Sequence, residues 1–141
     1  MSKIEAKPEP IVDAYVTAWN EREFGRLPDL VSESVVAHNP TAPGGALHGR
    51  EDLEAFMRGI LSGFPDFRVT VHEMLSSDDV VMYEATLSMT HEGEFQGIAP
   101  TGRTAEVREM ASYRVDDGRI QEYRTCFDRQ ETFEQLGLAD G

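Results

Sequence analysis

Three polar residues stand at positions where a side chain could bind a ligand. His38 ends a short strand-like segment, where its ring could donate a hydrogen bond to a carbonyl oxygen or simply lie at the surface. His91 continues the apolar alternation of the strand-like segment before it, so its ring is expected to face the core or a pocket. Arg108 lies in the middle of a predicted strand. Its charge either reaches solvent, pairs with Glu106 or Glu109, or stabilises an enolate.

Other polar residues point to structure rather than to metal chemistry. Asp128 begins the segment DRQE, whose spacing resembles a capping box, so Asp128 is expected to cap a final helix with Glu131 reaching back. The four histidines lie far apart, and Cys126 is the single cysteine. No spacing therefore resembles a zinc site, and no internal disulfide can form.

Apolar spacing predicts the helices that must position these groups. From Ile11 the apolar residues recur as on one helical face, which predicts a helix to about Arg22 and places Tyr15 and Trp19 in the core or a pocket wall. A second stripe predicts a helix closed by Gly63. Its members are Leu53, Phe56, Met57, Ile60 and Leu61. The segment from Asp128 predicts a short last helix that stops at Gly137.

A period of two begins at Phe67 and predicts long strands in the second half of the chain. The sequences SSDD and DDG predict the turns between them, the latter as a hairpin. In the segment GIAPTGR, Pro100 and Gly102 predict that the chain reverses within APTG, either as a plain connector or as the rim of a pocket. Helices first and antiparallel strands after them indicate an α+β fold, with a sheet that curves around the helices to make a pocket.

The amino-acid composition limits which binding partners and which cellular compartment are expected for the protein. The chain has 141 residues, with 26 acidic against 13 basic side chains and a net charge of −13, so nucleic acid and anionic membranes are not expected partners. The N-terminus has no apolar run like that of a signal peptide, and cytoplasmic location is the expectation. Eleven of the basic residues are arginines. This skew is typical either of proteins from a high-salt cytoplasm or of acidic mesophilic proteins from high-GC genomes.

Four segments together resemble the SnoaL-like polyketide cyclases, also called ester cyclases, of the nuclear transport factor two-like superfamily. They are GREDLEAFMRGILSGFPDFRVTV, THEGEFQGIAPTGR, YRVDDGRIQEY and DRQETFEQLG. The likeness spans about residues 11–138. It implies one domain over residues 1–141, with about 1–9 flexible, folded as a cone-shaped α+β barrel with one apolar pocket. It also implies a homodimer formed through the outer face of the sheet.

The chemistry implied by the resemblance is an intramolecular aldol closure without a cofactor, acting on a small apolar carbonyl or ester compound. A base removes a proton from an activated carbon, and the resulting enolate attacks another carbonyl. The family's acid/base is an aspartate at the end of the last long strand, and Asp128 stands in the matching place. The pocket would have to raise the pKa of that carboxyl by desolvation.

One departure from the family pattern concerns Arg124, which stands where many members have an aromatic residue, often tryptophan. By alternation Arg124, Cys126 and Asp128 share a face, so a cation near Asp128 would lower its pKa. Either Arg124 points away, or it binds an anionic substrate, or the protein is not a proficient aldolase. An isomerase, a dehydratase and a non-catalytic binding module of the same fold stay open. A buried Asp128 at the pocket floor would favour an enzyme, and an exposed Asp128 capping a helix would favour a binding module.

Overall fold

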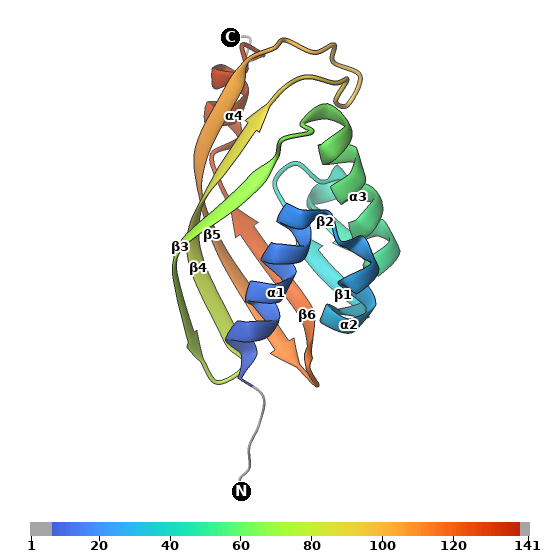
Figure 1. Ribbon diagram of the computed structural model, residues 1–141, viewed down its shortest axis with the longest axis vertical. Coiled ribbons are helices and arrows are strands. Elements are labelled where there is room, and N and C mark those ends of the chain that lie inside the picture. Colours follow the sequence, from blue (N-terminus) through green and yellow to red (C-terminus); the bar gives the residue numbers. More distant parts are fainter. Residues whose placement is uncertain (1–6, 139–141) are drawn as a thin grey trace, which may run out of the picture.

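The computed structural model describes residues 7–138, in which helices at the start of the chain are followed by long strands (Figure 1). Most of the segment expected to be flexible, residues 1–9, lies outside the described residues. Pro8 and Glu9 already belong to the first helix. The helices of the described part are α1 (Pro8–Glu21), α2 (Leu27–Leu30), α3 (Arg50–Gly63) and α4 (Arg129–Gln135), with short 3₁₀ turns at Phe24–Arg26 and Pro43–Gly45.

Six strands within residues 7–138 form one sheet in the order β2-β1-β6-β5-β4-β3. They are β1 (Val31–His38), β2 (Ala46–His48), β3 (Arg68–Ser77), β4 (Val80–Thr90), β5 (Thr104–Asp116) and β6 (Arg119–Cys126). The pair β1 and β6 is parallel and the other pairs are antiparallel. The α+β class is thus confirmed, with a mixed and open sheet in place of a purely antiparallel one.

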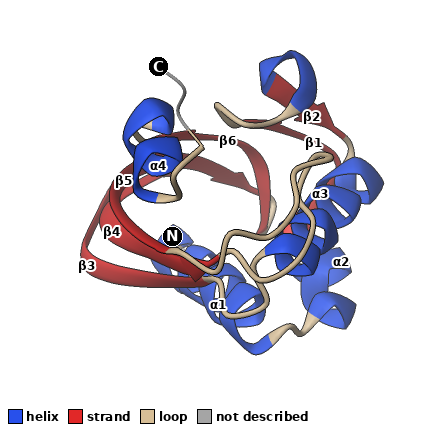
Figure 2. Ribbon diagram, turned by 90° about the horizontal axis from the view of Figure 1, so that it is seen from above, coloured by secondary structure: helices blue, strands red, loops and turns tan. Residues whose placement is uncertain are grey.

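The helices lie on the inner face of the bent sheet, which curves around them (Figure 2). Helix α1 contacts β3, β4, β5 and β6, whereas α3 contacts β1 and β2 and α4 contacts β5. The apolar stripe predicted for α3 faces inward, with Leu53 and Met57 almost fully buried. Buried residues alternate with half-buried ones in β4 and with mostly exposed ones in β5, so one face of the sheet completes the core.

The turns between the long strands show where local chemistry decides the chain path. Asp117 and Gly118 both have positive φ and join β5 to β6 as a two-residue hairpin, as the sequence DDG predicts. The reversal between β4 and β5 lies elsewhere than expected. Gln96 and Gly97 take positive φ, and Phe95 pairs with Ile98 on either side of them. The tight turn is therefore at residues 95–98, and the APTG segment runs on from it as an extended connection.

A register shift in β3 changes which of its residues face the core. The shift falls between Val71 and Glu73, so one residue of β3 has no partner on β4 and the alternation reverses beyond it. Met74 therefore packs against the core, and Leu75 points outward with 68% of its surface exposed.

Candidate active site

A cavity of about 80 Å³ lies between the inner face of the sheet and helices α1, α3 and α4. Its walls are mainly apolar and rich in aromatic rings. The aromatic and aliphatic lining residues are Trp19, Leu53, Phe56, Met57, Ile60, Phe64, Phe67, Val69, Leu87, Met89, Phe95, Phe127, Phe133 and Leu136. Among the described residues that line it, none is a lysine, arginine or histidine.

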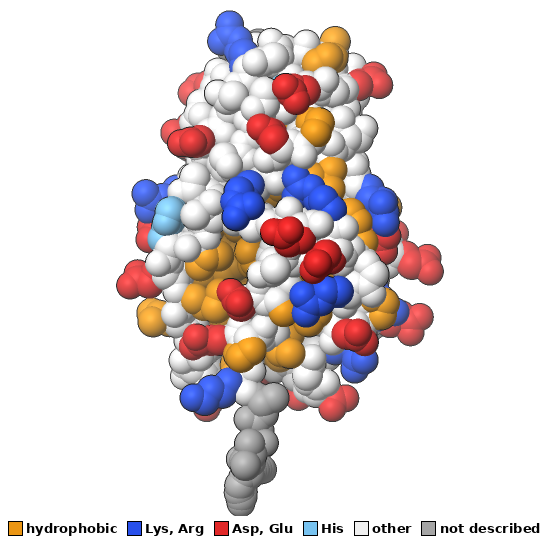
Figure 3. Space-filling model, viewed as in Figure 1, with side chains coloured by type: hydrophobic (Ala, Val, Ile, Leu, Met, Phe, Trp, Pro, Cys, Tyr) orange, Lys and Arg blue, Asp and Glu red, His pale blue; other side chains and the backbone are white. Residues whose placement is uncertain are grey.

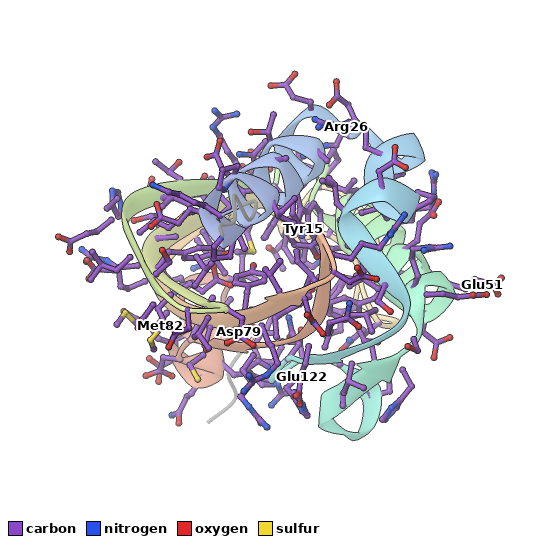
Figure 4. All side chains as sticks on the ribbon, turned by 90° about the horizontal axis from the view of Figure 1, so that it is seen from below. Tyr15, Arg26, Glu51, Asp79, Met82 and Glu122 are labelled. Atoms are coloured by element: carbon purple, nitrogen blue, oxygen red, sulfur yellow. The ribbon has the colours of Figure 1, made fainter. Side chains whose placement is uncertain are left out.

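Four tyrosines from α1 and three strands meet at one end of the cavity. The Tyr15 and Tyr123 hydroxyls share a hydrogen bond of 2.8 Å, and the Tyr83 and Tyr113 hydroxyls share one of 2.9 Å. The rings of Tyr113 and Tyr123 stack with centroids 4.7 Å apart. Burial raises the pKa of all four hydroxyls, so they stay neutral at physiological pH. Figure 4 shows Tyr15 pointing from α1 towards the interior of the molecule.

Glu109 is the single acidic side chain among the described residues of the cavity lining. It lies on β5 at the parity that faces inward, and only 5% of its surface is exposed. Its partner on β4 is Ala85, and the next inward residue on β5 is Ala111, so two of its neighbours on the inner face of the sheet are small. Burial raises its pKa from the usual 4.5 to about 7, and the Tyr83 hydroxyl partly opposes this shift by stabilising the ionised form.

Thr125 adds a hydroxyl group to the same wall. It lies on β6 directly opposite Ala111 of β5 and is 8% exposed. Its Oγ1 atom and the Oε1 atom of Glu109 are both buried and have no hydrogen-bond partner within the protein. The lining therefore combines apolar walls with two buried oxygen atoms that have no hydrogen-bond partner in the protein.

Comparison with known proteins identifies the family of this chain. The profile of the SnoaL-like polyketide cyclases matches residues 9–136. The chain belongs to the SnoaL-like polyketide cyclase family. No curated protein matches it at a significant level.

Among solved structures, the SnoaL-like chain is similar to wild-type IdmH from Streptomyces antibioticus, with 29% identity and a TM-score of 0.82 over 94% of this chain and 99% of that one. AclR from Streptomyces galilaeus shares 24% identity with a TM-score of 0.77, over 95% of this chain and 87% of AclR. TsrD from Streptomyces laurentii shares 21% identity with a TM-score of 0.82, over 98% of this chain and all of TsrD. The last two likenesses support the fold.

Asp128, the residue that the family resemblance assigns as acid/base, does not line the cavity of this SnoaL-like protein. It is exposed and begins helix α4, where its Oδ1 accepts a hydrogen bond of 2.9 Å from the backbone N–H of Glu131. Its backbone oxygen also accepts a bond from the Thr132 hydroxyl. This is the cap that DRQE predicts for Asp128, whereas among the described residues the Glu131 side chain forms no hydrogen bond back to the Asp128 backbone N–H. A catalytic role for Asp128 stays a prediction, and its position is the one expected for a binding module.

His38, Arg108 and Arg124 lie on the outer face of the sheet and outside the cavity lining. His38 Nε2 donates to Glu122 Oε2 at 2.8 Å, and this bond holds the pKa of the Glu122 carboxyl below its usual value. Arg124 points away from the cavity, with its guanidinium 3.6 Å from the same carboxylate. His38, Glu122 and Arg124 thus form a cluster at the surface, and Figure 4 shows Glu122 on the outside of the sheet. Arg108 pairs with Glu84 rather than with either glutamate expected from its own strand.

His91 is fully buried but does not line the cavity. The backbone N–H of Thr101 donates to its Nδ1 at 3.3 Å, and its ring lies 5.2 Å from that of Phe64, a wall residue. Because Nδ1 accepts a hydrogen bond, the ring hydrogen is on Nε2, which has no partner. His91 therefore holds the loop 91–103 in place and supports the wall from behind.

Tyr15 and Trp19 do line the cavity, as their helical stripe allowed. From the sequence, in contrast, Glu109 has no expected role in a site and is named only as a possible ion-pair partner of Arg108. A signal for its position exists in the alternation of β5. Its parity is shared by Ala105, Val107, Ala111, Tyr113 and Val115, all of them buried. A single carboxylate on an otherwise apolar strand face indicates a group held inside the core.

In residues 7–138 no group of three or more histidine, cysteine, aspartate or glutamate side chains could hold a metal ion. Across the same part of the chain, every helix is too short or too polar to span a lipid bilayer.

Proposed function

We propose that this SnoaL-like protein is an enzyme that moves protons at carbon atoms of a small, neutral carbonyl or ester compound, with Glu109 as the acid/base group. The observation that carries the proposal is a single carboxyl group, buried in an aromatic cavity, whose pKa is raised to about 7. A base with this pKa is ionised and protonated in comparable amounts near neutral pH, which suits both the removal and the return of a proton.

The proposed reaction is the aldol-type closure that the family name suggests, and IdmH, a similar protein, is described as a candidate polyketide cyclase. Ionised Glu109 would remove a proton from a carbon beside a carbonyl group. The enolate would attack a second carbonyl of the same molecule, and protonated Glu109 would return the proton to the new alkoxide. Isomerisation or dehydration would use the same proton transfers.

The second candidate is a binding module without turnover. The exposed position of Asp128 favours it, because the residue expected to catalyse is used as a helix cap. The two candidates make different predictions for Glu109. A catalytic Glu109 must exchange protons with a ligand carbon, whereas a binding residue need only form hydrogen bonds.

A proton-exchange assay tests the proposal without knowledge of the natural substrate. The probe is 2-indanone, a small neutral ketone, and ¹H NMR in D₂O follows the loss of its enolisable protons. We expect wild type to accelerate exchange over buffer and Glu109→Gln to lose roughly 10²–10⁴-fold of that acceleration. Glu106→Gln is the matched control, because Glu106 is an exposed glutamate on the same strand.

Asp128→Asn separates the two carboxyl groups. If it keeps full exchange activity, Asp128 is not the base. If it abolishes exchange while Glu109→Gln does not, the assignment to Glu109 is wrong and the family pattern holds. A wild-type rate equal to that of buffer would contradict the enzyme and favour the binding module.

Association and location form the rest of the proposal. Three large apolar side chains, Leu75, Met82 and Met110, are 54–68% exposed on the outer face of β3, β4 and β5, and Figure 4 shows Met82 pointing outward. A self-complementary contact through this face would cover them in a homodimer. We also propose that the protein works in the cytoplasm. We further propose that it does not bind nucleic acid, since its net charge is −13 and acidic side chains are interspersed with basic ones over the face in Figure 3.

A further inference from the structure

Two buried oxygen atoms on residues that line the cavity have no hydrogen-bond partner within the protein, and together they indicate what kind of polar group a ligand would place there. They are Oε1 of Glu109 and Oγ1 of Thr125. Buried polar atoms are almost always hydrogen-bonded, so an unpaired pair on two residues that line one cavity indicates the place of a ligand's polar group. The third unpaired atom, Nε2 of His91, belongs to a residue behind the wall.

The sheet register makes the residues that carry these two oxygens diagonal neighbours on one face of the sheet. Thr125 lies opposite Ala111, and Glu109 is two residues from Ala111 on the same strand and the same face. Such diagonal neighbours have Cβ atoms about 7 Å apart, and side chains of this length can reach one atom between them. Ala111, which adjoins both residues in this register, has only a methyl side chain.

The other side-chain oxygen atoms of the cavity lining are already paired. The tyrosine hydroxyls bond to one another in two pairs. The Asn39 side-chain oxygen accepts from Thr41, and the Thr132 hydroxyl donates to a backbone oxygen. If Tyr113 donates to Tyr83, the Tyr83 hydrogen is free to face Glu109, which leaves a single Glu109 oxygen for the ligand. Glu109 and Thr125 therefore hold the buried lining oxygens that remain for a ligand.

We propose that Glu109 and Thr125 form a two-point anchor for one hydroxyl or enol group of a neutral, flat, aromatic ligand. The ligand O–H donates to Glu109, and the ligand oxygen accepts from the Thr125 hydroxyl. The ring lies among the aromatic walls, where edge and face contacts favour it. Anionic ligands are rejected, because no basic side chain among the described lining residues would offset their charge beside Glu109.

This inference rests on the cavity of the proposed function, but it concerns binding and is tested without turnover. The probes are 4-fluorophenol, its near-isostere 4-fluorotoluene and the anion 4-fluorobenzoate, each titrated by ¹⁹F NMR. Removing the hydroxyl leaves both anchor atoms buried and unpaired, so we expect 4-fluorophenol to bind roughly 10- to 100-fold more tightly than 4-fluorotoluene. We expect 4-fluorobenzoate not to bind.

The Thr125→Val variant keeps the shape of the side chain and removes its hydroxyl. We expect it to weaken binding of 4-fluorophenol by roughly 5- to 20-fold and to leave 4-fluorotoluene unaffected. Thr70→Val on the exposed face of β3 is the matched control and should change neither. Thermal melts followed by circular dichroism check that both variants fold.

Three results would overturn the anchor: no binding of 4-fluorophenol by folded wild type, equal affinities for the phenol and the toluene, or unchanged phenol affinity in Thr125→Val. The outcome is separable from that of the proposed function. Preferential binding of the phenol without ketone exchange would support the anchor and refute the enzyme. If wild type exchanges the ketone protons, Glu109→Gln loses this activity, and 4-fluorophenol binds no more tightly than 4-fluorotoluene, the enzyme is supported and the anchor is refuted.

Discussion

Replacing Glu109 with glutamine should change how the stability of the protein depends on pH. The pKa of Glu109 is raised from 4.5 to about 7 in the folded state by burial. Below pH 4.5 both states hold the proton and the carboxyl group has no pH-dependent effect. Between pH 4.5 and 7 the unfolded chain releases the proton and the folded one keeps it, so stability falls as pH rises. At 1.36 kcal/mol per pH unit the full loss is roughly 3 kcal/mol, reached above pH 7.

Urea unfolding at pH 5 and pH 8 measures this difference. Glutamine cannot ionise, so Glu109→Gln should lose less stability than wild type between the two pH values. For an unfolding slope of about 2 kcal/mol per molar urea, the difference amounts to a midpoint shift of about 1 M. Glu106→Gln, on the exposed face of the same strand, should keep the pH dependence of wild type. If Glu109→Gln and wild type lose equal stability over this range, the carboxyl group is not held in the state that we describe.

Four further predictions concern the cap, the outer face, the loop and the charge. Asp128→Ala should cost ~1 kcal/mol in urea unfolding, while Asp128→Asn should cost little, and equal costs would contradict the cap. Met82→Lys, on the exposed apolar face, should convert a dimer to a monomer in light scattering, and a wild-type monomer mass would refute the dimer itself. Gly93→Ala should cost about 1–3 kcal/mol, because its Cβ would lie 2.0 Å from a backbone oxygen, whereas Gly59→Ala in α3 meets nothing and should stabilise the helix. The melting temperature should rise between 0.01 M and 1 M salt, since screening relieves the repulsion of a −13 chain, and an unchanged value would remove the high-salt interpretation.

The parts of the fold that follow from local periodicity could be predicted from the sequence. The α3 stripe is set by side chains three and four residues apart, and this spacing puts them on one face whatever the rest of the chain does. The hairpin at Asp117 and Gly118 needs two residues with positive φ, which glycine and aspartate adopt more readily than most. Gly137 likewise takes φ of 75° and ends α4, with the Leu138 N–H donating to the Phe133 oxygen.

Features that depend on distant partners were not predictable in this way. The parallel pairing of β1 with β6 joins segments more than 80 residues apart, and no local pattern encodes it. The register shift in β3 depends on how that strand meets β4. The proline in APTG is a stronger local turn signal than Gln96 and Gly97. The chain nevertheless turns at Gln96 and Gly97, where Phe95 pairs with Ile98. Tertiary contacts selected among alternatives that were each locally acceptable.

The candidate site shows the same division. Alternation correctly puts Arg124 and Cys126 on one face of β6, and that face is the exposed one. Asp128 continues their parity, so the argument that placed a cation beside it also placed it outside the cavity. The inward residues of this region are Tyr123, Thr125 and Phe127, all in the cavity wall. Family position favoured Asp128, whereas strand parity applied to both strands would have selected Glu109 and Thr125.

The composition of the inner sheet face explains why a carboxyl group can be held there at all. Two neighbours of Glu109, Ala85 and Ala111, are small, and the Tyr83 hydroxyl stabilises the ionised form. Burial and the Tyr83 hydroxyl act in opposite directions on the pKa, and burial has the larger effect. The group can therefore lose its proton near neutral pH, next to a space that a ligand can fill, and this combination makes Glu109 suitable for proton transfer.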